Sequence, residues 1–304
     1  GRVVLMGQIL VDRVLQGACP IHGGGSEWAR DGGTHVGGGF NALVAARRMG
    51  AEAISLSPIG TGPHASMIEA ALAREGIVDA GPRVDGVDNG FCVAMIGHDA
   101  ERTFISTKGA ETMTPKTAWA DFVRTMSPGD VLYIDGYLMD HPANREAAEA
   151  ALRVLPEGVR VLLDVSPVIG IPESLPTHHA IISMNSVEAR TIAKQSRLDG
   201  YLPFDSLSCR LAQTLGRDTL IRLGASGAYF ARSASPDSET SAAHIPTPTI
   251  DAVDTNGAGD AHTGVLAASL ALGIPLERGL VLANCAGALA STVPGPASCP
   301  TRED

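Results

Sequence analysis

Short apolar runs alternate with amphipathic segments through the second half of the chain. The runs with strand character are Val131–Ile134, Val159–Val165, Ala180–Met184 and Thr219–Leu223. The segments between them with a helical period are Ala143–Leu155, Ser186–Gln195 and Asp205–Leu215. Strands that alternate with helices form a parallel sheet covered on both faces, so this half predicts an α/β fold. Two further helices, Ala258–Leu272 and Leu276–Thr292, are expected to close the chain.

The first half adds strands and helices of the same kind. Val3–Met6 and Ala53–Ile59 are strand candidates, and Phe40–Met49 and His64–Glu75 have the apolar stripe of surface helices. The fold class predicted for the chain is therefore a doubly wound, mostly parallel α/β sheet with helices on both faces.

Two stretches interrupt this rhythm. Residues 8–35 alternate weakly between apolar and polar positions, and Phe91–Gly97 and Arg102–Ser106 flank a polar turn at 98–101, which indicates a hairpin. We expect these pieces, at about 8–35 and 90–108, to form a small β-strand lid inserted in a single α/β domain that spans residues 1–304.

Composition excludes several classes of function. The chain has 304 residues, 35 glycines and a net charge of −10, and this acidic balance argues against a nucleic-acid partner. It has no run of 18 apolar residues, so no membrane span is expected. The five cysteines form no CxxC pair, which favours a reducing cytoplasm over a disulfide framework or a zinc site.

The segment Asp254-Thr255-Asn256-Gly257-Ala258-Gly259-Asp260 precedes an apolar helical stretch. Small residues at a helix start allow the amides of Asn256, Gly257, Ala258 and Gly259 to converge on an anion, which the helix dipole also stabilises. Asp260, in the first turn, could accept a proton from a hydroxyl that attacks a phosphoryl group. The alternative is a glycine-rich turn in which Asp260 only caps the helix.

A second glycine-rich segment, Gly37-Gly38-Gly39-Phe40-Asn41, also lies at a helix start. It fits the pattern GxGxxA, but no buried strand precedes it and no acidic residue follows the next strand, so it does not predict a dinucleotide site. Close approach of the backbone to a polar ligand, with Asn41 as donor and acceptor, is the functional interpretation. A turn followed by a helix cap is the alternative.

Two more segments follow strand candidates. Asn185 and Glu188 come after Ala180–Met184, where they could hold the water shell of Mg²⁺, or serve only as a helix cap. Arg222, Gly224 and Gly227 belong to a strand-to-loop segment that could lie under a nucleotide or form an ordinary hairpin turn. No Walker A motif is present in the sequence, which excludes a P-loop nucleotidase.

These four segments, in this order, resemble the ribokinase-like (PfkB) family of carbohydrate and nucleoside kinases over almost the whole chain. The resemblance implies an ATP-dependent kinase with Asp260 as the base and the 256–259 amides as an anion hole. It also implies sugar binding by Asp12, Gly37–Gly39 and Asn41, and nucleotide binding near Asn185, Glu188, Arg222, Gly224, Gly227 and Asn284. Many members bind a monovalent cation such as K⁺ near Asp254 and the Pro294–Ser298 turn.

The segments Glu101–Phe104 and Asp135–Tyr137 look most like bacterial sugar kinases of the YegV type. We expect a phosphotransferase that acts on the hydroxymethyl group of a sugar, with ATP and Mg²⁺ as cofactors. The alternatives are a nucleoside kinase, for which Phe40, Phe91, Phe104, Trp28 or Tyr137 could stack on a base, and a non-catalytic nucleotide or sugar sensor. A phosphorylated sugar would need a cation such as Arg102 or Lys108. Exposed lid strands predict a homodimer joined through the lid.

Overall fold

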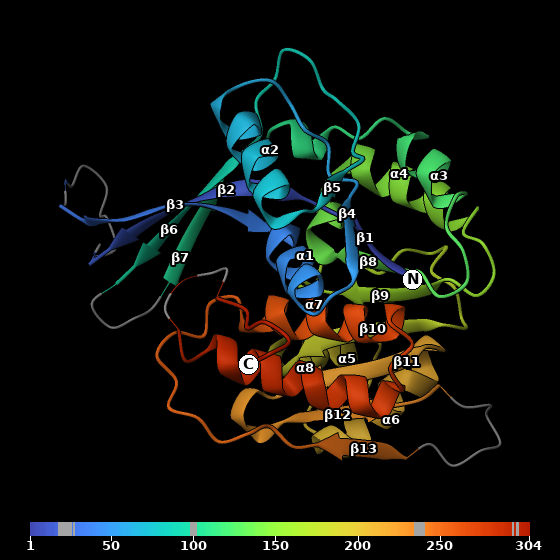
Figure 1. The fold of residues 1–304 in the computed structure, drawn as a ribbon. Coiled ribbons are helices and arrows are strands. Elements are labelled where there is room, and N and C mark those ends of the chain that lie inside the picture. Colours follow the sequence, from blue (N-terminus) through green and yellow to red (C-terminus); the bar gives the residue numbers. More distant parts are fainter. Residues whose placement is uncertain (18–25, 27, 98–101, 234–240, 294, 296–297) are drawn as a thin grey trace.

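The computed structural model places the described strands in two sheets, a large one in the body and a small one that projects from it (Figure 1). The structure describes residues 1–17, 26, 28–97, 102–233, 241–293, 295 and 298–304.

The described strands of the large sheet run in the order β13-β12-β11-β10-β9-β8-β1-β4-β5. All neighbours from β11 to β5 are parallel, and β12 and β13 join one edge antiparallel. The strands are β1 Arg2–Met6, β4 Glu52–Ser55, β5 Val78–Asp79, β8 Val131–Asp135, β9 Arg160–Asp164, β10 Ala180–Asn185, β11 Asp218–Arg222, β12 Ala228–Ala231 and β13 Ala242–Ile245.

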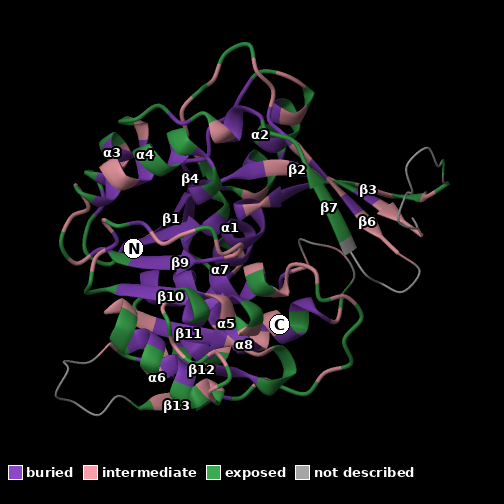
Figure 2. Cartoon of the chain, turned by 180° about the vertical axis from the view of Figure 1, so that it is seen from behind, coloured by how far each residue is buried: buried purple, intermediate pink, exposed green. Residues whose placement is uncertain are grey.

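Helices cover both faces of this sheet because its strands are apolar on both sides. Val3 and Leu5 of β1 belong to one core with α1, α2, α7 and α8, whereas Val4 and Met6 point into a second core with α3 to α6. Figure 2 shows the buried strands between exposed helix surfaces. The helices are α1 Gly39–Arg48, α2 Pro63–Glu75, α3 Ala118–Val123, α4 Pro142–Leu152, α5 Ser186–Gln195, α6 Phe204–Leu215, α7 Ala258–Ala271 and α8 Leu276–Ala290. None of the helices in the described ranges is long and apolar enough to cross a membrane.

The small sheet, which we call the lid, has the strand order β3-β2-β6-β7. Its strands β2 and β6 are parallel, and the outer pairs are antiparallel. The strand β3 leads directly into α1, so the lid is continuous with the body at that point. The turn expected at 98–101 lies outside the described residues. The lid strands are β2 Ile9–Gln16, β3 Arg30–Gly38, β6 Phe91–Ile96 and β7 Arg102–Ser106.

The expected fold class is confirmed, with local differences. The two-residue strand β5 was not predicted, because it is too short to show a pattern. The strand predicted over 53–59 ends at Ser55, because Pro58 has no N–H for a ladder and Ile59 makes only an isolated bridge to Arg83. The strands β12 and β13 were not predicted, since each has four residues of which two are alanine, a residue of low strand propensity. The six-residue helix α3 was also missed, because it is too short to establish a period.

Candidate active site

Four adjacent parallel strands end in polar residues at one edge of the large sheet. Asp135, Asp164, Asn185 and Arg222 are the last residues of β8, β9, β10 and β11. Asp135 is in register with Asp164, and Asn185 with Arg222. Ligands of open α/β sheets bind at the carboxyl ends of the strands, so this edge is where a site is expected.

Two cavities meet at this edge. The lid-side cavity, of about 500 Å³, is enclosed by the body and by residues of β2, β6 and β7. The loop-side cavity, of about 570 Å³, lies between the 247–252 loop, α7 and α8. Four residues line both cavities, namely Asp164, Ser166, Gly259 and Asp260. A group bound in one cavity can therefore reach a group bound in the other at Asp260.

Asp260 lies in the first turn of α7 and is held by one side chain. Asn41 Nδ2, from the first turn of α1, donates a hydrogen bond to Asp260 Oδ2 at 3.1 Å. Burial raises the pKa of Asp260 to about 6, while the Asn41 hydrogen bond opposes this rise. A carboxylate of that pKa is ionised at neutral pH and is basic enough to take a proton from a hydroxyl in a transition state.

The backbone before Asp260 exposes some of the expected amides. Gly257, the N-cap of α7, has φ +77°, a left-handed conformation that glycine adopts without strain. The N–H of Asn256 donates to Asp254 Oδ1 at 2.9 Å and that of Ala258 to Thr255 O at 3.3 Å. Within the described contacts, the N–H groups of Gly257 and Gly259 have no protein acceptor. Both residues line the lid-side cavity, so these two amides are open to a ligand there. The anion hole formed by all four amides stays a prediction.

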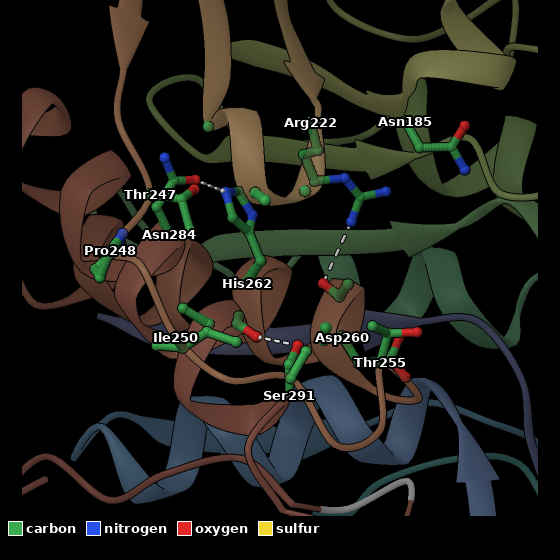
Figure 3. Close-up of a pocket in the computed structure, with 18 of the residues that line it drawn as sticks. Asn185, Arg222, Thr247, Pro248, Ile250, Thr255, Asp260, His262, Asn284 and Ser291 are labelled. Carbon is green, nitrogen blue, oxygen red and sulfur yellow. Dashed lines mark hydrogen bonds between the residues drawn. The ribbon is translucent and has the colours of Figure 1, made fainter.

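Arg222, whose side chain is 13% exposed, is a cation beside this helix start. Its Nη2 donates to Asp164 Oδ1 at 3.0 Å, and its Nη1 lies 3.3 Å from both Gly259 O and Thr263 Oγ1. Thr263 Oγ1 in turn donates to Asp164 Oδ2 at 2.9 Å. The network joins β9, β11 and α7, and it holds the guanidinium at the meeting point of the two cavities. Figure 3 shows the Arg222 side chain extending toward the start of α7, beside Asp260.

The lid supplies one carboxylate to the lid-side cavity. Asp12 of β2 is in register with Cys92 of β6, which is in register with Ser106 of β7, and all three line the cavity. Burial raises the pKa of Asp12 to about 6. A Cβ at Gly37 would lie 1.9 Å from Asp12 Oδ2, so a larger residue there would force the Asp12 carboxylate to move.

The other residues of that glycine-rich segment divide between the cavity and the core. Gly38, Gly39 and Asn41 line the lid-side cavity, whereas Gly37 does not. Phe40 is buried in the core and Trp28 is almost fully exposed, so neither contributes to the cavity.

Arg222 and the residues that follow it line one side of the loop-side cavity. The segment Gly224–Ser226 is a 3₁₀ turn between the antiparallel strands β11 and β12, so the hairpin interpretation describes its backbone correctly. Gly224 and Gly227 nevertheless line the cavity. Figure 3 shows Pro248 and Ile250 toward one end of it and Arg222 and Asp260 toward the other.

Asn284 also lines the loop-side cavity, but its amide is used within the protein. Its Nδ2 donates to Ile245 O at 2.9 Å and Pro246 O at 3.2 Å, so its Oδ1 must accept from His262 Nε2 at 3.1 Å. This fixes the proton of His262 on Nε2 and leaves Nδ1 as an acceptor without a partner. Burial lowers the pKa of His262 to about 3, so the ring is neutral.

Asn185 and Glu188 form a capping box at the start of α5. Asn185 Oδ1 accepts from the N–H groups of Val187 and Glu188 at 2.9 Å, and Glu188 Oε2 accepts from Asn185 N at 2.6 Å. Asn185 lines the loop-side cavity, and Glu188 Oε2 lies 3.9 Å from Arg222 Nη2. Over the described ranges, no three His, Cys, Asp or Glu side chains converge to hold a metal directly.

Asp254 connects two loops next to α7. Its Oδ2 accepts from Gly295 N at 3.1 Å, and its Oδ1 accepts from Asn256 N. The first of these bonds joins Asp254 to the turn that was expected to share a monovalent cation with it. Residues 294, 296 and 297 of that turn lie outside the described residues.

Sequence reasoning missed four residues of the site, namely Gln8, Asp135, Asp164 and Thr263. Gln8 N donates to Asp135 Oδ2 at 2.6 Å, and both residues line the lid-side cavity. Asp135 and Asp164 each follow an apolar strand run directly, and an acid at that position is the signal that could have found them. Gln8 and Thr263 had no comparable signal.

Comparison with known proteins identifies the family. The model of the pfkB family carbohydrate kinases matches residues 3–303. The "Uncharacterized sugar kinase YegV" of Escherichia coli is 31% identical over 99% of this chain and 92% of its own length. The aminoimidazole riboside kinase of Salmonella typhimurium is 28% identical over 85% of this chain and 82% of its own.

Solved structures share the fold. A ribokinase from Thermotoga maritima has a TM-score of 0.83 at 20% identity, covering 99% of this chain and 97% of that one. The Arabidopsis thaliana ribokinase complexed with ribose and ATP has a TM-score of 0.77 at 24% identity, covering 99% and 96%. The family expected from the four motifs is confirmed. This chain belongs to the pfkB family of carbohydrate kinases and is a phosphotransferase with an alcohol group as acceptor.

Proposed function

We propose that this enzyme transfers the γ-phosphoryl group of ATP to a hydroxymethyl group of a sugar, with Asp260 as the general base. The observation that carries this proposal is that Gly259 and Asp260 line both cavities. An acceptor in the lid-side cavity and a nucleotide in the loop-side cavity would then meet at the carboxylate. Phosphoryl transfer needs this in-line arrangement more than it needs covalent chemistry.

On the acceptor side, Asp12 and Asn41 bind sugar hydroxyls, and Gly38 and Gly39 allow the sugar to approach the backbone. Asp12 has no Lys or Arg partner in the described part of the chain, so its carboxylate is available to accept from hydroxyl groups. Asp260 takes the proton of the attacking hydroxyl as the new P–O bond forms.

On the transfer side, the N–H groups of Gly257 and Gly259 stabilise charge on the transferred group, together with the dipole of α7. Arg222 adds a fixed positive charge next to Gly259. Because Asp164 and Thr263 hold the guanidinium in place, this charge needs no reorganisation during the reaction.

In the loop-side cavity, the adenine end of ATP lies toward Pro248 and Ile250, and the phosphates lie toward Gly224, Gly227 and Arg222. The lining supports this, because its apolar side chains gather at the 248–252 loop. The Arabidopsis ribokinase, which shares the fold, was solved with ATP.

Mg²⁺ would be held through water by Glu188, whose carboxylate is oriented by the capping box. Glu188 lines neither cavity and its carboxylate lies 3.9 Å from Arg222, so it would act on Mg²⁺ through the waters that this ion keeps. The ion would neutralise charge on the phosphates. Asp254, which joins the 254–256 loop to Gly295, is the residue proposed to hold a monovalent cation such as K⁺.

A nucleoside acceptor is the second candidate. Phe104 of the lid and Tyr137 after β8 line the lid-side cavity and are 60% and 53% exposed, so either ring is free to stack on a planar base. The relative from Salmonella typhimurium is a riboside kinase by name.

We also propose a homodimer joined through the lid. The strands β3 and β7 are the edges of the lid, and Ile105 on β7 is 58% exposed. Unpaired edges of this kind are usually covered. Sedimentation equilibrium at working concentration should give twice the chain mass, and a monomer would exclude this assembly.

The function is tested by incubating the protein with ATP, Mg²⁺ and panels of free sugars, sugar acids and nucleosides, with ADP release as the readout. Phosphorus NMR of the product should place the phosphate on a hydroxymethyl carbon. ATP binding without turnover on any acceptor would favour a sensor and contradict the proposal.

A further inference from the structure

Acidic side chains dominate the lid-side cavity. Lys108 is the one Lys or Arg side chain among the described residues that line it. The carboxyl groups that line it are those of Asp12, Glu111, Asp135, Asp140, Asp164 and Asp260.

Two of these carboxyl groups lie near a Lys or Arg side chain, and two others accept hydrogen bonds from backbone N–H groups. Asp164 pairs with Arg222 at 3.0 Å, and Asp140 lies 3.9 Å from Lys108. Glu111 accepts hydrogen bonds from the N–H groups of Gly90 and Gly109 at 2.7 and 2.8 Å. Asp135 accepts from those of Gln8 and Leu138 at 2.6 and 3.1 Å, but no Lys or Arg side chain among the described residues pairs with it. The side chain of Lys108 is 67% exposed, so this single cation is partly screened by solvent and stands against six carboxyl groups.

Asp12, Asp135 and Asp260 have no Lys or Arg partner in the part of the chain that the structure describes. Burial is the main cause that raises the pKa of Asp12 and Asp260 to about 6 and that of Asp135 to about 7, and the charges of Asp164 and Asp260 raise that of Asp135 further. At neutral pH, Asp12 and Asp260 are therefore mostly ionised and Asp135 is about half ionised. The cavity carries net negative charge, and charges interact there more strongly than in bulk water.

Two unpartnered polar atoms belong to the same lining. Gln8 Nε2 and Asn41 Oδ1 are buried and have no hydrogen-bond partner among the described residues. The two residues are only 4% and 6% exposed, and both line the lid-side cavity. A buried polar atom without a partner costs about 1–3 kcal/mol. One lone donor and one lone acceptor are satisfied together by a ligand with hydroxyl groups.

We propose that the acceptor is a polyhydroxyl compound without a phosphate or carboxylate group, that an ammonium substituent strengthens its binding, and that Gln8 and Asp135 take part in selecting it. This inference rests on the proposed function only in naming the cavity's occupant as the acceptor. An anionic group would meet Asp12, Asp135 and Asp260, and Lys108 is the one Lys or Arg side chain among the described lining residues that could receive it. An ammonium group would be attracted to the same three carboxylates.

The charge of the cavity can be measured without a substrate. Ser106 is exposed and lines the cavity, so Ser106→Cys in a Cys92→Ser background places one reporter thiol there. Its modification by a cationic and an anionic methanethiosulfonate reagent is followed by peptide mass spectrometry at pH 8. The ratio of the cationic to the anionic rate is divided by the same ratio measured with 2-mercaptoethanol, a free thiol. This division cancels the difference in intrinsic reactivity between the two reagents. The thiolate fraction cancels as well, since both reagents meet the same thiol.

We expect a normalised ratio of at least about tenfold in favour of the cation, which corresponds to about 1.4 kcal/mol. Asp135→Asn, and separately Asp12→Asn, should reduce the ratio several-fold. Asp121→Asn, an exposed acid on α3, is the matched control and should leave it unchanged. A ratio of one or below overturns the inference, and it does so whether or not the protein turns over any substrate.

A kinetic test follows on the sugar scaffold that the screen identifies. Its amino derivative should have a kcat/KM equal to or above that of the parent sugar. The derivative with a phosphate on the same carbon should have a kcat/KM about a hundredfold below that of the parent sugar. Gln8→Leu should raise KM for the neutral sugar more than it lowers kcat. A phosphate derivative that is the better substrate overturns the inference.

Discussion

Asn41 Nδ2 donates to Asp260 Oδ2 at 3.1 Å, which joins the first turn of α1 to the first turn of α7 across 219 positions of sequence. Because α1 begins where the lid strand β3 ends, this bond connects the lid to the proposed base. It also counteracts the effect of burial on the pKa of Asp260. The position of the lid and the basicity of the carboxylate are therefore linked through one amide.

The pH dependence of kcat/KM should have an acid limb near pH 6. Asp260 must be ionised to accept a proton, and its pKa of about 6 means that activity falls roughly tenfold per pH unit below that value. Asp12 titrates in the same range, so the variant Asn41→Ala is used to decide whether Asp260 or Asp12 controls the acid limb. It removes the hydrogen bond that lowers the pKa of Asp260, and the limb should move to higher pH. A limb that stays in place in Asn41→Ala would show that another group controls it.

Asp260→Asn should stabilise the fold at pH 8 and leave it unchanged at pH 4. The folded-state pKa of Asp260 lies above the ordinary value of 3.8, so ionisation of this group weakens the fold as pH rises through about 6. Asparagine mimics the neutral acid at every pH. We expect about 1–2 kcal/mol at pH 8, or roughly 3–6 °C in Tm by calorimetry. If Asp260→Asn and the wild type had the same Tm at pH 8 as well as at pH 4, the Asp260 carboxylate would be well solvated in the folded protein.

Arg222→Met should be strongly destabilising, because it leaves Asp164 buried without its cation. The expected loss is about 3–5 kcal/mol in the free energy of unfolding, measured by urea titration. The double variant Asp164→Asn/Arg222→Met removes both charges and should recover most of this loss. Its kcat should stay low, because the positive charge next to Gly259 is missing. Recovery of kcat together with stability would assign Arg222 a purely structural role.

His262 should remain neutral between pH 5 and 8 and carry its proton on Nε2. Its burial lowers the pKa to about 3, and the Asn284 amide, oriented by two carbonyl groups, requires a donor from the ring. Nitrogen-15 NMR of labelled histidine should assign one set of signals to this tautomer, identified by its loss in His262→Gln. Titration of those signals near pH 6.5 would contradict the arrangement.

Much of the parallel core was predictable because its strands and helices have strong, different periods. The short strands β12 and β13 were not, since their pairing depends on the neighbouring β11 rather than on their own pattern. In the site, Asp260 and Asn41 came from local motifs, and the structure brings them into contact. The acceptors of the Asn256 and Ala258 amides could not be predicted from the sequence, because they are set by the local turn. Asp164 could have been inferred from its strand end, whereas its partner Thr263 depends on how α7 packs.

The most direct test of the proposed mechanism is the turnover of Asp260→Asn with the acceptor that the screen identifies. The account predicts a loss in kcat of at least about a thousandfold, while calorimetric Kd values for ATP and for the sugar stay within about threefold of wild type. Asn is close in shape to Asp and keeps an oxygen for Asn41 Nδ2, so the site should remain assembled. A kcat within about tenfold of wild type, with intact binding, would show that Asp260 is not the base.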